Sequence, residues 1–116
     1  MKVIARDSLP FSEIAREFVG QDHGVSGISF LLLEAPPGGG PRLHRHDYDE
    51  VVVVEEGSVR FTAGERDVDM SDGDVIVVPA GTPHKFVNTG HGTLRQIDIH
   101  ASSTFVTQWL EDQSAA

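Results

Sequence analysis

The sequence predicts an all-β protein, either a sandwich or a barrel, and two observations lead to this fold class. Apolar runs are short and rich in valine and isoleucine, residues that favour strands. Clusters of glycine, proline, aspartate and serine separate these runs at short intervals, as turns do in sandwiches and barrels. A chain of 116 residues suits one domain, so a single domain is expected over residues 1–116.

Nine strands are expected, each bounded by turn signals. They cover residues 2–5, 25–34, 42–46, 50–55, 59–63, 67–70, 74–78, 84–88 and 94–100. The run Val51 to Val54 does not alternate with polar residues, so both of its faces are expected to be covered. The large apolar residues expected in the core or in a cavity wall are Phe30, Leu32, Phe61, Phe86 and Trp109.

The two ends of the chain carry weaker patterns. Residues 1–24 are expected to form an N-terminal arm. Helical spacing of apolar residues within 11–18 leaves a short helix and an irregular segment as alternatives there. Residues 104–111 are expected to form a helical turn or a last strand, and residues 111–116 a frayed tail.

The charge balance argues against two classes of partner. The formal net charge is −9, from 9 basic and 18 acidic residues, so the chain is expected to avoid nucleic acids and anionic membranes. The apolar runs are far shorter than the roughly 20 residues that span a bilayer. Without cysteine or a signal-peptide pattern after Met1, a cytoplasmic location is expected.

Three histidines and a glutamate have the spacing of a metal site. His44 and His46 are two residues apart, so on a strand both imidazoles point to the same face. Glu50 follows a turn-like stretch and can bend back towards them. His84 follows residues 79–83, whose prolines and glycine fix where the next strand begins. We refer to His44, His46, Glu50 and His84 as the four candidate ligands.

The donor set of this site narrows the choice of metal. Three imidazoles and one carboxylate suit Mn, Fe, Ni, Co, Cu or Zn and are too rich in nitrogen for Ca or Mg. One divalent transition metal per chain is therefore expected. An octahedral metal with four protein ligands keeps two open positions, where water, dioxygen or a bidentate substrate can bind.

The two stretches that hold these residues resemble the signature motifs of the cupin superfamily. The patterns G-x5-H-x-H-x3-E-x6-G and G-x5-P-x-G-x2-H-x3-N are filled at every position. The matching residues are Gly38, His44, His46, Glu50, Gly57, Gly73, Pro79, Gly81, His84 and Asn88. The spacer at 58–72 is short, as in small single-domain cupins of the Cupin_2 type. The resemblance covers residues 38–88 and implies a jelly-roll β-barrel, or double-stranded β-helix. It also implies that the four candidate ligands bind the metal and that Asn88 either supports those ligands or belongs to the framework.

Other polar residues have two interpretations each. Tyr48 can donate a proton to a substrate or pack at the barrel rim. Arg42 can bind a substrate carboxylate or form a structural ion pair. Gln96, Asp98 and His100 share one face of a strand, which either meets solvent or lines the pocket. In the pocket, Asp98 and His100 become candidate acid–base groups.

A metal-dependent enzyme acting on a small organic molecule is the expected function. Cleavage with dioxygen, isomerisation and cyclisation all fit a metal with open positions. Glu50, Tyr48 and His100 are the candidate catalytic residues, Glu50 acting as a base if it leaves the metal. A small-molecule binding or sensor module without turnover is the alternative, and a purely structural metal is a weaker one. A homodimer is expected, because the domain is small and the family resemblance favours one.

Overall fold

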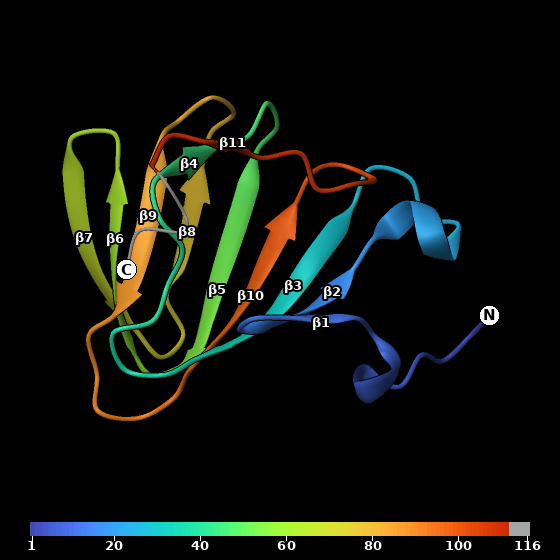
Figure 1. Cartoon of the computed structure of the whole chain (residues 1–116), viewed down its shortest axis with the longest axis horizontal. Helices are drawn as coiled ribbons and strands as arrows, with labels where there is room; N and C mark the ends of the chain where they lie inside the picture. The colour runs from blue at the N-terminus through green and yellow to red at the C-terminus, as the bar shows by residue number, and fades with distance from the viewer. Residues whose placement is uncertain (112–116) are drawn as a thin grey trace.

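Two antiparallel sheets face each other in the computed structural model, which describes residues 1–111 (Figure 1). The first has six strands in the order β1 (Phe11–Ser12), β2 (Ala15–Phe18), β3 (Ser29–Ala35), β10 (Leu94–His100), β5 (Glu50–Glu56) and β8 (Val75–Val78). The second has five, in the order β11 (Gln108–Trp109), β4 (His44–Arg45), β9 (His84–Asn88), β6 (Ser58–Ala63) and β7 (Arg66–Ser71). Short 3-10 turns occupy Arg6–Ser8 and Gly20–His23. The all-β, single-domain prediction is confirmed.

Most of the expected strands are present. The strands at 84–88 and 94–100 have the predicted bounds, and four others differ by one residue at an end or at both. Two are shorter: 42–46 is reduced to β4, and 25–34 is replaced by β3, which begins at Ser29. The strand expected at residues 2–5 is wrong. That segment has no strand partner in the described chain, and Val3 is fully exposed.

The segment 11–18 is neither a helix nor an irregular segment, so both alternatives were wrong. It forms a hairpin of β1 and β2 that turns through Glu13, whose φ is 55°. β2 pairs with β3 from Ala15 opposite Leu33 to Phe18 opposite Phe30. This ladder satisfies the backbone of the segment, and pairing with a distant strand outweighs the local helical spacing. For residues 104–111 the strand alternative is confirmed by β11. Of the expected frayed tail, residues 112–116 lie outside the described part of the chain.

Alternation along the strands divides the interior into an apolar and a polar end. Val52, Val54 and Leu94 are fully buried and pack with Phe61 and Phe86, whose ring centroids are 4.9 Å apart. The polar end holds four buried polar residues at the ends of strands, namely His44 on β4, Glu50 at the start of β5, His84 at the start of β9 and His100 at the end of β10. Asp98 and Gln96 continue this polar row along β10, opposite Val52 and Val54. Polar groups thus gather at one end of the barrel, where a binding site can form.

Asn88 is a framework residue, one of the two roles that the family resemblance implied. Its buried side-chain amide donates to the carbonyls of Ala35, at 3.0 Å, and Gly92, at 2.8 Å. Its backbone exchanges hydrogen bonds with Gly38 and Gly39. Asn88 therefore ties the loop after β3 to the end of β9. Among the described residues no helix is long or apolar enough to cross a membrane.

Candidate metal centre

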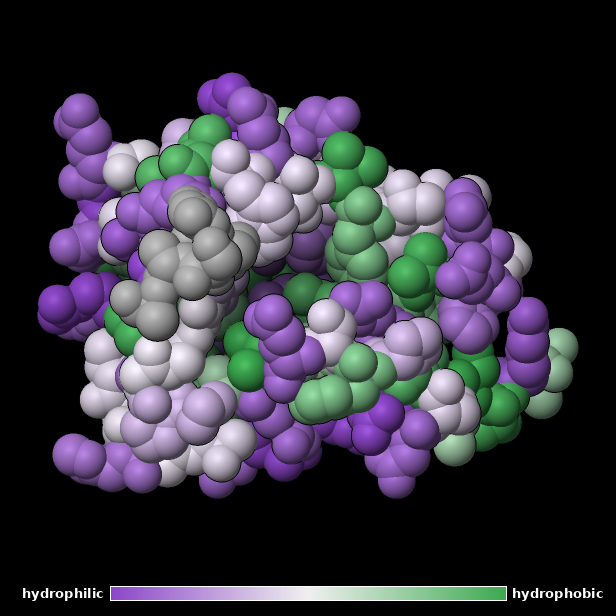
Figure 2. All heavy atoms as spheres, in the orientation of Figure 1, coloured by the Kyte–Doolittle hydropathy of each residue, from purple (hydrophilic) through white to green (hydrophobic). Residues whose placement is uncertain are grey.

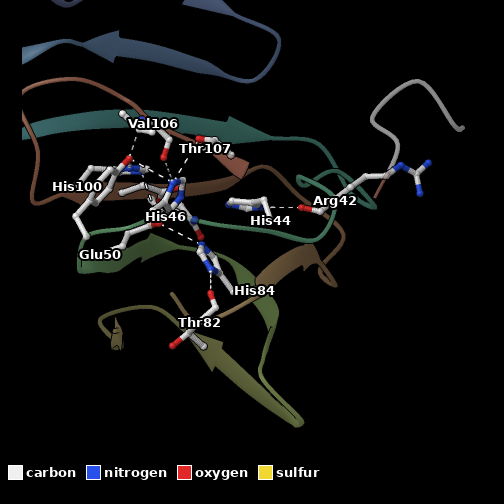
Figure 3. A network of polar contacts seen from close by, with 12 residues as sticks. Arg42, His44, His46, Glu50, Thr82, His84, His100, Val106 and Thr107 are labelled. Atoms are coloured by element: carbon white, nitrogen blue, oxygen red, sulfur yellow. Dashed lines mark hydrogen bonds and ion pairs between the residues drawn. The ribbon is translucent and has the colours of Figure 1, made fainter. Parts of the chain in front are cut away.

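The four candidate ligands converge from separate elements into one buried cluster (Figure 3). One ligand atom of each lies within 4.8 Å of those of the others. His44 on β4 stands opposite His84 at the start of β9, and Glu50 begins β5. His46 lies in the loop between β4 and β5. The Gly81 amide donates to the His46 carbonyl at 2.7 Å and ties this loop to the turn before β9.

Backbone carbonyls fix the orientation of all three histidine rings. The Nδ1 atoms of His44, His46 and His84 lie 2.7, 2.8 and 2.8 Å from the carbonyls of Arg42, Val106 and Thr82 (Figure 3). Because a carbonyl only accepts, each Nδ1 must carry the proton. When the ring is neutral, its Nε2 lone pair then faces the cluster. Metal-binding histidines are commonly oriented in this way.

The centre of the cluster has the polarity that a cation requires. Glu50 Oε1 lies 3.2 Å from the Nε2 atoms of both His46 and His84. The buried Nε2 of His46 lies outside hydrogen-bond geometry and has no partner in the described chain. An orphaned buried nitrogen is costly, and a metal ion would satisfy it together with the neighbouring carboxylate. The residues therefore fit a divalent transition metal.

The pKa shifts agree with this arrangement. Burial lowers the pKa of His44 to about 4, so the ring is neutral at pH 7. Burial works against the charge on Glu50, but the close His46 ring and the hydrogen bond with His84 outweigh it and hold the Glu50 pKa well below its usual range. Burial likewise opposes charge on His84, yet its hydrogen bond to Glu50 raises its pKa. The cluster thus presents a carboxylate among imidazoles.

A fourth histidine at the site has the opposite orientation. The Tyr48 hydroxyl lies 2.7 Å from His100 Nδ1 and also accepts from the Val106 amide at 3.3 Å. His46 Nδ1, 3.3 Å away, already donates to a carbonyl, so the Tyr48 proton goes to His100. His100 therefore carries its own proton on Nε2, which lies 3.7 Å from Glu50 Oε1. Burial lowers the pKa of His100 to about 4 and raises that of Tyr48 to about 12, which keeps both groups neutral.

The other polar candidates separate into two groups. Asp98 and His100 line the cavity, whereas Gln96 lies behind them and donates to Asp98 Oδ1 at 2.8 Å. Full burial, aided by the charge of Glu50, raises the pKa of Asp98 well above its usual value. Arg42 lies before β4 and contributes its carbonyl to His44, while its guanidinium points away from the cluster (Figure 3).

A cavity of about 630 Å³ opens beside the four candidate ligands. Its remaining walls come largely from the β1–β2 hairpin, β3 and the segment 105–109. Figure 2 shows a hollow near the centre of the molecular face on which these segments meet. Phe86 and Trp109 line the cavity and Phe61 is in the core, as expected. Phe30 and Leu32 instead point to the outer face of the six-stranded sheet, because their register places them opposite Ile99 and Ile97.

Sequence reasoning missed the residues that hold the site from behind. The Val106 carbonyl orients His46, and the Thr107 hydroxyl lies 3.3 Å from the same nitrogen. Ile14 and Ala15 form part of the far wall. A carbonyl has no side-chain signature. The β1–β2 hairpin is stabilised by its pairing with β3, which is distant in the sequence. The sequence therefore contained no local signal for the Val106 carbonyl or for the hairpin wall.

Comparison with known proteins agrees with this fold. The chain is 33% identical over 61 residues to the HTH-type transcriptional regulator PuuR of Escherichia coli. This alignment covers 53% of this chain and 33% of PuuR. The chain therefore spans about a third of the length of that relative. An oxalate decarboxylase structure from Bacillus subtilis superposes with a TM-score of 0.81 at 19% identity, over 92% of this chain and 31% of that one.

A protein of matching size also shares the architecture. A conserved protein with a double-stranded β-helix domain from Klebsiella pneumoniae superposes with a TM-score of 0.76 at 16% identity, over 97% of this chain and 99% of that one. At such identities the likeness concerns the fold alone. The family model described as the cupin domain matches residues 31–100 of this chain, a range that includes both histidine motifs. The match spans more than half of the sequence, and the chain belongs to the cupin family.

Proposed function

We propose that this cupin is a metal-dependent enzyme that acts on a small organic molecule. The orphaned Nε2 of His46 beside the Glu50 carboxylate is the observation that carries this proposal. The four candidate ligands would hold one divalent transition metal. Manganese is a specific candidate, since the Bacillus subtilis oxalate decarboxylase, which shares the fold, is described with Mn(II) centres. A cytoplasmic location remains a prediction.

The residues around the metal have distinct proposed roles. When bound, the metal would polarise a substrate oxygen or present dioxygen beside the substrate. Glu50 would serve as ligand and, on leaving the metal, as base. His100 presents an N–H to the cavity and would donate a hydrogen bond to a substrate oxygen. Tyr48 does not line the cavity, so it would act by holding the His100 ring.

Metal analysis after reconstitution tests this proposal. The purified chain, stripped with a chelator and reloaded separately with each candidate ion, is expected to retain about one equivalent of at least one of them. His46→Ala should lose most of that metal while its circular dichroism keeps the β signal. His23→Ala is the matched control, because that ring stacks on Phe18 away from the cluster. If the wild-type chain retained none of the ions, the proposal would be wrong.

Turnover separates the two proposed reaction classes. An oxygenase should consume dioxygen and depend on Fe, Cu or Ni, whereas an isomerase or cyclase should turn over without dioxygen. A non-catalytic binding module is the second candidate, favoured by the similarity to the PuuR regulator. If the protein is such a binding module, small organic molecules would bind to the metal-loaded chain and be recovered chemically unchanged.

We propose further that two copies associate through the outer face of the six-stranded sheet. Two rows of side chains cross five of its strands. One row is Phe18, Phe30, Ile99, Val51 and Val77, and the other is Arg16, Leu32, Ile97, Val53 and Val75. We call these ten residues the apolar sheet face. Val75 and Val77 are 58% and 63% exposed. Within one chain, no element of residues 1–111 covers the outer side of the Val51–Val54 run, which was expected to be covered on both faces.

A second copy is the occupant that suits this surface. Arg16 is the one charged residue of the two rows, so two such faces can meet without the repulsion that a net charge of −9 creates elsewhere. Five strands at about 4.8 Å spacing make a strip roughly 20 Å wide, which with its polar rim approaches the ~800 Å² per partner of stable interfaces. The outer face of the other sheet is polar instead, with Arg60 paired to Asp69 and Thr62 to Asp67.

Light scattering on a sizing column tests the dimer. The wild-type chain of 12.6 kDa should elute at twice that mass at micromolar concentration. Ile97→Lys should be monomeric, because a buried lysine would face its copy. Val87→Lys is the control on the outer face of the five-stranded sheet and should stay dimeric. A monomeric wild type would overturn the dimer and leave the face to a different protein.

A further inference from the structure

The cavity is larger than the metal centre requires. Its volume of about 630 Å³ lies within the roughly 300–1,000 Å³ typical of pockets for drug-sized ligands. The histidines and Glu50 occupy one end. The other lining side chains are mainly apolar. Ile14, Ala15, Leu31 and Leu33 come from the hairpin and β3, and the rings of Phe105 and Trp109 stand 4.9 and 5.0 Å from those of His100 and His44. A ligand that fills the cavity must therefore extend from the metal across an apolar surface.

Four carboxyl side chains line the cavity. They are Glu13, Glu17, Glu50 and Asp98, and no lysine or arginine of residues 1–111 is among the lining residues. Arg16 on β2 is turned aside, with its guanidinium donating to the Leu9 carbonyl at 3.0 Å and lying over the Phe11 ring. An anionic group at the hairpin end would meet Glu13 and Glu17 without a compensating cation.

We propose that the ligand of this cavity has an apolar, ring-sized body, binds the metal through oxygen at one end and carries no anionic group at the other. This inference rests on the proposed metal centre and names its substrate class. The apolar body lies against Ile14, Leu31 and Phe105, and its oxygen end lies by His100. The N–H on His100 Nε2 suits an oxygen acceptor there. Burial raises the pKa of Asp98, which favours the neutral form of this carboxyl over the charged form.

Three hydroxamic acids test the proposal, since all bind metals through the same pair of oxygens. Acetohydroxamic acid lacks a body, benzohydroxamic acid adds an uncharged ring, and 4-carboxybenzohydroxamic acid adds a carboxylate at the far end of that ring. Calorimetry on the metal-loaded chain is expected to show benzohydroxamic acid binding at least about tenfold more tightly than acetohydroxamic acid, because the ring buries apolar surface. The added carboxylate should cancel most of that gain.

A pair of isoleucine variants locates the ring. Ile14 and Ile76 are both partly buried and pack against the same core, but only Ile14 lines the cavity. Ile14→Ala should weaken benzohydroxamic acid about threefold to tenfold and leave acetohydroxamic acid unchanged. Ile76→Ala should change neither affinity.

Two results would overturn the inference while the metal centre stands. One is equal affinity for benzohydroxamic and acetohydroxamic acids, which would mean that no apolar body is recognised. The other is tighter binding of 4-carboxybenzohydroxamic acid than of benzohydroxamic acid, which would mean that an anionic far end is accepted. A chain that retains no metal fails earlier, in the metal analysis, and would remove both this inference and the proposed function.

Discussion

The cavity has a metal end and a hairpin end, which differ in how firmly their side chains are held. At the metal end, the Nδ1 atoms of His44, His46 and His84 lie 2.7 to 2.8 Å from backbone carbonyls. At the hairpin end, β1 has only two residues, and its Phe11 is 59% exposed. The geometry for chemistry is therefore fixed by several short polar contacts, whereas the shape of the pocket depends on a lightly attached hairpin.

Removing the charge at the metal end should have the largest effect. Glu50→Gln keeps the size of the side chain but leaves the imidazole cluster without its anion. Metal affinity is expected to fall by about 100-fold or more, because the ligand and the attraction for the cation are lost together. Competition with a chromophoric chelator measures the change. If the hairpin end contributes only to the shape of the pocket, Ile14→Ala should leave metal affinity unaltered in the same assay.

A hydroxyl between the two ends should have an intermediate effect. Tyr48→Phe removes the donor to His100 Nδ1 and leaves the four candidate ligands in place. Metal affinity should change less than about tenfold, while ligand affinity falls because the His100 ring is free to turn. Proton NMR of the imidazole N–H can follow this ring. An unchanged His100 signal in Tyr48→Phe would show that the hydroxyl does not hold it.

Relieving the hairpin turn should have the smallest effect. Glu13 has a φ of 55°, a left-handed conformation that glycine adopts without steric cost. Glu13→Gly should raise the free energy of unfolding by less than about 1 kcal/mol, since the relief of strain is partly offset by the freedom glycine gains in the unfolded chain. Chemical denaturation measures it. Metal content should not change, and a loss of metal would break the proposed independence of the two ends.

The two ends also differ in how well the sequence predicts them. The two-residue spacing of His44 and His46, with Glu50 and His84 after turns, is local information and predicted the convergence of the metal end, although β4 ends at Arg45 and His46 lies in the following loop. The hairpin end depends on the register of β2 with β3, which joins residues 15–18 to residues 30–33. Local spacing within 11–18 suggested a helix, and only pairing with a distant strand decided otherwise. The same limit applies to Phe30 and Leu32, whose direction follows from the register of β3.

The segment 105–109 links two properties that are usually treated as separate. Phe105 and Trp109 close part of the cavity wall, and the Val106 carbonyl between them orients His46. This segment is attached to the second sheet by the two residue pairs of β11 with β4, Gln108 with Arg45 and Trp109 with His44. A fluctuation that detaches β11 would widen the entrance and free a metal-binding ring at the same moment. Rates of ligand entry and of metal exchange would then rise and fall together across variants of this segment.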